Sequence, residues 1–153
     1  MNPETEDPAR HDVVAILMIQ HQHIQQLLRR VDSLRGTAKS DAFVTLAHYL
    51  ERHESAEQQV VFPVARDALK FGPAIIAERV GEEHRAHEML TKLRKLHVDD
   101  PLFDDTFGEF RESVLAHAVA EEAEVFARLR AALPVARLVA MASELTAAEA
   151  AMA

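Results

Sequence analysis

The chain has 153 residues, 48% of them hydrophobic, which suffices for one domain with its own core. Its formal net charge of −8 provides no basic surface for nucleic acid or an anionic membrane, so neither is an expected partner. The lack of cysteine excludes disulfides, cysteine-ligated zinc and iron–sulfur clusters. With neither an apolar leader nor an apolar run of ~20 residues, the expected location is the cytoplasm.

Four long helices are expected, because apolar residues recur at helical spacing between capping residues, prolines and glycines. Their expected ranges are 7–35, 40–63 with a short continuation over 64–69, 73–96 and 101–133. After Pro134, an alanine-rich amphipathic segment predicts a fifth helix. The expected fold is therefore all-α, an up-down antiparallel four-helix bundle with a C-terminal fifth helix. The expected domain plan has an N-terminal extension and helix start at 1–11, the bundle at 12–133 and the C-terminal helix at 134–153.

A short motif occurs twice, once on the second and once on the fourth expected helix. In each copy a glutamate follows a histidine by four residues, and the copies lie 64 residues apart. Residues i and i+4 share one helix face, so each copy presents an imidazole and a carboxylate together. The copies are His53 with Glu57 and His117 with Glu121, and the histidines that precede them by 32 and 33 residues are His21 and His84.

All six of these side chains fall on apolar stripes that are expected to face the core. His84, for example, is placed on a stripe with Ala77 and Val80. A buried carboxylate without a partner costs several kcal/mol or loses its charge. The nearest inward-facing basic residues, Lys95 and Arg128, each lie roughly 16 Å along the helix axis from a histidine of the set. Bound cations are therefore the most direct counter-charge.

Four imidazoles and two carboxylates are more ligands than one tetrahedral zinc ion takes. They suit two metal ions that share bridging carboxylates and lie ~3.5–4 Å apart. Nitrogen-rich ligation favours iron over magnesium or calcium, with manganese and zinc as alternatives. Taken singly, each histidine would be read as a hydrogen-bonded core residue, and each His–Glu pair as a solvated surface pair. The clustering of all six favours a metal site.

Two further residues are candidates for the surroundings of this site. His87 lies about 60° from His84 around its helix, so it either adds a ligand or packs at the rim of the cavity. Tyr49, the one tyrosine, precedes His53 by one turn on the same stripe. Its hydroxyl either forms a hydrogen bond near the metals or is satisfied as that of an ordinary core tyrosine.

The pattern resembles the haemerythrin-like, or HHE cation-binding, family over about residues 12–130. The matching marks are His21 followed by Ile24, Leu27 and Leu28; His53-x-x-x-Glu57 before Val61-Phe62-Pro63; Glu83-His84; and His117-x-x-x-Glu121-Glu122 before Val125-Phe126. The resemblance implies a four-helix bundle around a non-haem di-iron centre, with two iron ions joined by an oxo or hydroxo bridge. It also implies the ligand roles: terminal for His21, His53, His84 and His117, and bridging for Glu57 and Glu121.

The sequence departs from the oxygen-carrying haemerythrins that it resembles. Those carriers place two histidines four residues apart on the third helix, where His84 has only Val80 and Glu88 at that spacing. They also use His-x-x-x-x-Asp on the last helix, whereas glutamates follow His117 at both +4 and +5. Some relatives carry tyrosine just before the proline, where this chain has Phe62. A reversible oxygen carrier is therefore not the expected function.

A redox metal pair with open positions inside an apolar bundle is suited to react with small oxidants, namely dioxygen, hydrogen peroxide or nitric oxide. Within this class, the missing carrier arrangement favours catalase- or peroxidase-like detoxification during oxidative stress. The alternative is a non-catalytic iron or oxygen sensor, iron store or iron donor, and a metal-free scaffold bundle is the third hypothesis. The expected partners are these small inorganic ligands, and the sequence leaves the oligomeric state open.

Overall fold

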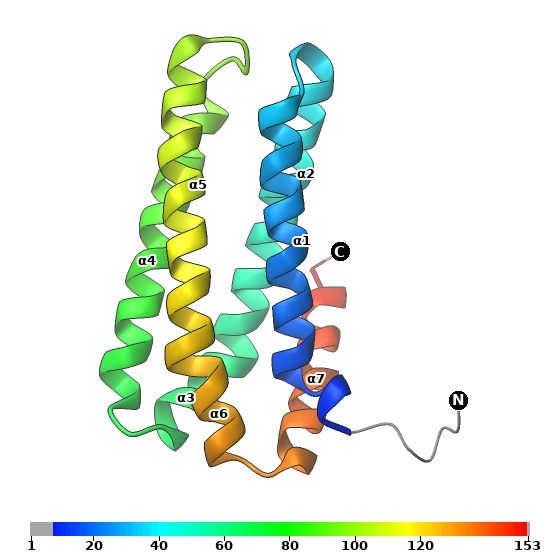
Figure 1. The fold of residues 1–153 in the computed structure, drawn as a ribbon, viewed down its shortest axis with the longest axis vertical. Coiled ribbons are helices and arrows are strands. Elements are labelled where there is room, and N and C mark those ends of the chain that lie inside the picture. Colours follow the sequence, from blue (N-terminus) through cyan, green and yellow to red (C-terminus); the bar gives the residue numbers. More distant parts are fainter. Residues whose placement is uncertain (1–7, 153) are drawn as a thin grey trace, which may run out of the picture.

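The computed structural model describes residues 8–152, and the regular structure of this part is entirely helical (Figure 1). Four long helices form the bundle: α1 Val13–Ser33, α2 Gly36–Ala56, α4 Gly72–Arg94 and α5 Pro101–Glu121. Shorter elements extend or connect them: η2 Pro8–His11, η3 Glu57–Val61, α3 Phe62–Ala68, η4 Glu122–Phe126, α6 Ala127–Ala132 and α7 Val135–Ala150. Successive long helices alternate in direction, so the all-α antiparallel bundle with a fifth C-terminal helix is confirmed.

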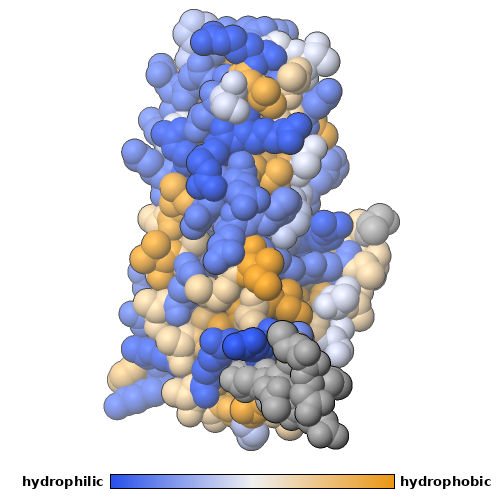
Figure 2. Space-filling model, turned by 45° about the vertical axis from the view of Figure 1, so that its right-hand side comes forward, coloured by the Kyte–Doolittle hydropathy of each residue, from blue (hydrophilic) through white to orange (hydrophobic). Residues whose placement is uncertain are grey.

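The helices pair in chain order, α1 against α2 and α4 against α5. The C-terminal helix α7 lies beside the lower half of α1 and also contacts α2 and η3 (Figure 1). Figure 2 shows a face on which hydrophilic side chains dominate the upper half and hydrophobic ones reach the surface in the lower half. None of the described helices combines the length and apolar character that a membrane crossing requires.

The first helix starts later than the sequence predicts. Asp12 is its N-cap, and the Asp12 carboxylate accepts a hydrogen bond from the backbone N–H of Ala15 at 2.8 Å. The same carboxylate pairs with Arg130 near the end of α6 at 2.9 Å, which ties the two ends of the bundle sequence together. Pro8, where the helix was expected to start, instead begins the 3₁₀ turn η2, and Asp7 lies outside the described residues.

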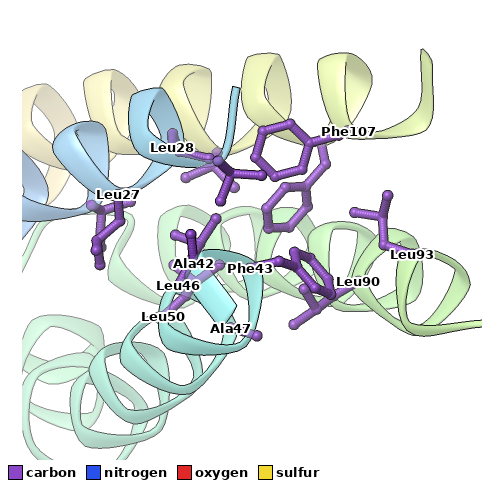
Figure 3. Close-up of a cluster of buried hydrophobic side chains, with 14 of the residues drawn as sticks. Leu27, Leu28, Ala42, Phe43, Leu46, Ala47, Leu50, Leu90, Leu93 and Phe107 are labelled. Carbon is purple, nitrogen blue, oxygen red and sulfur yellow. The ribbon is translucent and has the colours of Figure 1, made fainter. Parts of the chain in front are cut away.

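The core consists of two apolar clusters, one in each half of the bundle. The upper cluster draws leucines and phenylalanines from all four long helices, as Figure 3 shows for Leu28, Phe43, Leu90 and Phe107. The lower cluster also includes α7. Along each long helix, the two clusters are separated by a short stretch that contributes buried polar side chains. The candidate site occupies this polar layer.

A tight turn before α4 depends on a glycine. Phe71 adopts a left-handed φ of 58°, and a Cβ on the next residue, Gly72, would lie 2.2 Å from the carbonyl oxygen of Arg66. We expect Gly72→Ala to lower the free energy of unfolding by about 1–3 kcal/mol, because the backbone must move. Gly81→Ala, where the nearest atom is 3.6 Å away, should raise it by about 0.5–1 kcal/mol. Urea denaturation measures both values, and equal values for the two variants would contradict the expectation.

Candidate metal centre

Five of the six residues that the sequence singles out come together in the polar layer. Each is at most 8% exposed, and both glutamates are fully buried. The helices bring together His21 from α1, His53 from α2, Glu57 at the start of η3, and His117 and Glu121 from α5. Three segments distant in sequence therefore converge on one small volume.

The buried donors form two overlapping groups of four. Within each group, one ligand atom from every member lies within 4.8 Å of the others. The two groups are His21, His53, Glu57 and Glu121, and Glu57, Glu83, His117 and Glu121. Because Glu57 and Glu121 belong to both groups, two neighbouring cations would share these carboxylates.

The sixth position holds Glu83 instead of His84. Glu83 is 2% exposed, and its Oε2 lies 3.1 Å from Nε2 of His117, whereas His84 is exposed and outside the buried cluster. Ile76 and Leu90 define the inward face of α4, and each lies seven residues, or two full turns, from Glu83. The predicted stripe through Ala77 was displaced by one residue, which rotates His84 by about 100° away from the core.

The two additional candidates also lie outside the cluster. His87 is exposed and shares a surface cavity with His84. Tyr49 is partly buried, and its ring faces that of His23 at 4.6 Å between centroids. Burial and the charge of Glu149 raise the pKa of Tyr49. The position thus agrees with the alternative of a packed tyrosine.

A π-helical turn follows each His-x-x-x-Glu motif. In η3 the backbone N–H of Phe62 bonds to the carbonyl of Glu57, and in η4 that of Ala127 bonds to the carbonyl of Glu122, both across five residues. Such turns widen a helix locally and occur frequently at functional sites. A buried phenylalanine stands at the end of each turn, Phe62 directly after η3 and Phe126 as the last residue of η4. The centroid of the Phe126 ring lies 5.3 Å from that of His21.

Outer hydrogen bonds orient two of the imidazoles. The carboxylate of Glu149 on α7 accepts from Nε2 of Gln20 at 2.8 Å, so Oε1 of Gln20 is left to accept from Nδ1 of His53 at 2.7 Å. Nε2 of His53 then faces Glu57 at 3.3 Å. In the same way, Glu82 holds Nδ1 of His117 at 2.8 Å. Partners of this kind fix the ring orientation and tautomer of metal-binding histidines.

The electrostatics of the cluster favour cations. Burial raises the pKa of Glu57 well above its ordinary value, and the charge of Glu121 adds to the effect. Burial lowers the pKa of His53 to about 3, so its ring is neutral. Burial opposes protonation of His117, but hydrogen bonds to Glu121 and Glu83 outweigh it and raise its pKa to about 11. Without metal, the cluster therefore holds protons on Glu57 and His117, which an arriving cation must displace.

The donor atoms also fit bound metal because several have no hydrogen-bond partner. Among the described residues, both carboxylate oxygens of Glu57 and Nδ1 of His21 are buried without a hydrogen bond, although Nε2 of His53 approaches Oε1 of Glu57 to 3.3 Å. Buried polar atoms are otherwise nearly always satisfied, because an unmade bond costs about 1–3 kcal/mol. Buried carboxylate oxygens and imidazole nitrogens that lack a partner are suitable ligands for iron, manganese or zinc.

The fold and the site together define a helical-bundle protein with a buried cluster of carboxylates and histidines suited to hold metal. A family model for the Hemerythrin HHE cation binding domain matches residues 12–147, and the chain belongs to this family of metal-binding proteins. No match was found among the curated proteins. A solved structure, a Hemerythrin HHE cation binding domain-containing protein from Mycobacterium kansasii, is similar with a TM-score of 0.78. The similarity covers 92% of this chain and 86% of that one, and at 21% identity it shows the shared fold.

The link from His53 to α7 leads to a prediction. Glu149→Ala frees the Gln20 amide to turn, so His53 loses its fixed orientation. We expect metal affinity to fall by about tenfold, as for other outer partners of metal ligands. Glu144→Ala removes an exposed carboxylate that pairs with Arg137 on the same helix and should leave affinity unchanged. Competition with a chromophoric chelator measures the metal affinity of both variants. Equal losses of affinity would show that α7 affects metal binding only through the stability of the fold, and not through the orientation of His53.

Proposed function

We propose that the protein is a non-haem di-iron protein that reacts with small oxidants, and that its main activity is catalase- or peroxidase-like breakdown of hydrogen peroxide. The observation that supports a dinuclear centre is the sharing of Glu57 and Glu121 between the two buried groups of ligands. In this proposal His21 and His53 hold one iron, and Glu83 and His117 hold the other. Three imidazoles and three carboxylates leave coordination positions for a small ligand.

A small cavity beside the cluster supports the choice of substrate class. It has a volume of about 20 Å³, and its walls combine the ligand histidines with apolar residues such as Ile24, Leu50 and Val114. A space of this size holds about one water molecule, so it admits dioxygen, peroxide or nitric oxide and excludes organic substrates. Disproportionation of two peroxide molecules to water and dioxygen needs no second kind of substrate, which suits a cavity this small.

A glutamate that no sequence motif singles out is suited to transfer a proton in this cavity. Glu54 lines the cavity, and burial raises its pKa well above the ordinary value, with the charge of Glu83 adding to the effect. In our proposal its carboxyl group carries a proton at neutral pH and gives it to an oxygen atom of peroxide in the cavity. The metals would supply the redox change, and the apolar walls limit access of water.

Oxygen evolution tests the proposal. Protein loaded with two irons per chain should release dioxygen from hydrogen peroxide in an oxygen-electrode assay, and Glu54→Gln should slow the release by about 10²-fold. Glu112→Gln, at an exposed carboxylate on α5, is the control and should leave the rate unchanged. A fully iron-loaded protein that releases no dioxygen and consumes no peroxide would contradict the enzyme.

One observation favours a second candidate, a non-catalytic iron or oxygen sensor, store or donor. The hydrogen-bonded link from His53 through Gln20 reaches Glu149 near the end of α7. A change at the centre would therefore alter how the C-terminal helix docks. Iron loading that changes amide exchange in α7 without peroxide turnover would support this candidate over the enzyme.

A further inference from the structure

A second, larger cavity lies between α2 and α4 and opens to solvent. Its volume is about 290 Å³. Its wall carries carboxylate, amide and imidazole groups from both helices and from η3. The residues used below are Glu51, Glu54, Gln58, Glu83, His84 and His87.

The inner end of this cavity is part of the metal centre. Glu83 lines it, although the side chain is almost completely buried and belongs to one of the two ligand groups. Gln58, on the π turn η3, donates from Nε2 to Oε1 of Glu83 at 2.8 Å, while Oε2 of Glu83 lies 3.1 Å from His117. The carboxylate thus reaches from the wall of the open cavity to the buried histidine.

The outer end carries exposed donor groups. His84 and His87 are both exposed and lie three residues apart, so they are neighbours on one face of α4. Glu51 stands across from them on α2 and is held at the rim by an ion pair with Arg94. Imidazole and carboxylate are the donors that first-row divalent metals accept, and surface histidines of this kind exchange ligands freely.

The two cavities beside the centre differ in what they can pass. The small one, at about 20 Å³, holds about one water molecule and is too small for a divalent cation with its shell of bound water. The open one offers oxygen and nitrogen donors from the rim to Glu83. Glu54 lines both cavities and so stands between them. Neutral small molecules and cations therefore have separate approaches to the same centre.

We propose that the open cavity is the uptake path for the metal, in which His84 and His87 capture a hydrated divalent iron ion at the rim and Glu83 receives it at the inner end. The inference rests on the proposed di-iron function. It also gives a role to the two histidines that the sequence singled out and that lie outside the buried cluster.

Uptake kinetics test this path without any assay of activity. Metal-free protein is mixed anaerobically with ferrous iron, and the rate of uptake is followed by competition with ferrozine, with iron per chain measured at the end. The double variant His84→Ala/His87→Ala should load about tenfold more slowly and still reach the wild-type iron content. The control variant His48→Ala/His97→Ala removes two exposed histidines elsewhere and should load at the wild-type rate.

Results that differ from these expectations would contradict either the uptake path or the di-iron function. An unchanged rate in the His84/His87 variant would refute the uptake path. A lower final iron content in that variant would also refute it, because one of the two histidines would then be a ligand of the centre. If wild-type protein takes up no iron at all, the di-iron function fails, and this is known before any variant is compared.

Discussion

Glu57→Gln is expected to remove metal binding and, at the same time, to stabilise the metal-free protein. Glu57 belongs to both ligand groups, so its loss affects both metal positions. An amide is a poor metal ligand compared with a carboxylate, and we expect the iron content to fall from about two per chain to less than about one. The same change removes a carboxyl group that is fully buried without a hydrogen bond.

The stabilisation should depend on pH in a defined direction. The pKa of Glu57 is raised in the folded state, so the group favours folding below its unfolded pKa of about 4.5, and this contribution is lost as pH rises through the folded pKa. Glutamine does not titrate. The metal-free variant should therefore be more stable than the wild type by about 1–3 kcal/mol near pH 8, with a smaller difference near pH 5.

Thermal denaturation in the presence of a chelator at several pH values measures the stability of the metal-free proteins. Metal analysis after desalting measures the iron content per chain. Glu124→Gln, at an exposed carboxylate that pairs with Arg128, is the matched control and should change neither quantity. A Glu57→Gln protein that keeps two irons would show that this carboxylate does not ligate. A metal-free variant less stable than the wild type would show that the buried charge is compensated in another way.

Glu83→Ala should lower the metal content and His84→Ala should not, although the two residues are adjacent. Removing Glu83 takes one donor from the second group and leaves the group of His21, His53, Glu57 and Glu121 complete. We therefore expect about one tightly bound metal per chain for Glu83→Ala and about two for His84→Ala. Metal analysis and the near-ultraviolet spectrum of the loaded proteins distinguish them. Two metals in Glu83→Ala and one in His84→Ala would mean that α4 rotates by one residue when metal binds, so that His84 becomes the ligand.

The sequence predicted most of the fold because its signals are periodic. Long apolar stripes between prolines and glycines define the helices. The doubled His-x-x-x-Glu motif identifies four of the buried polar residues, and the histidine 32 residues before its first copy adds His21. The third long helix is the exception. Glu82, Glu83 and His84 are consecutive polar residues, so a rotation of one residue exchanges an acidic ligand for an imidazole, and sparse apolar neighbours on α4 do not fix that rotation.

Other parts of the site carry no signal in a single sequence. Gln20 and Glu82 are placed by contacts between helices far apart in the chain, and neither has a distinctive spacing from the histidine it orients. The π turns are equally hidden, because five residues of an ordinary helical sequence form them. Their position directly after each motif is evident only in the folded chain.

The division of the core into two apolar clusters has a consequence for cooperativity. Hydrophobic contacts join the helices within the upper and the lower half, but the layer between them is held by ionisable groups that partly oppose one another. In the metal-free chain we expect this layer to couple the two halves weakly, so that unfolding of one half destabilises the other only slightly. Metal ions bound to residues of all four long helices would link the two halves, so we expect the metal-loaded bundle to unfold cooperatively as one unit.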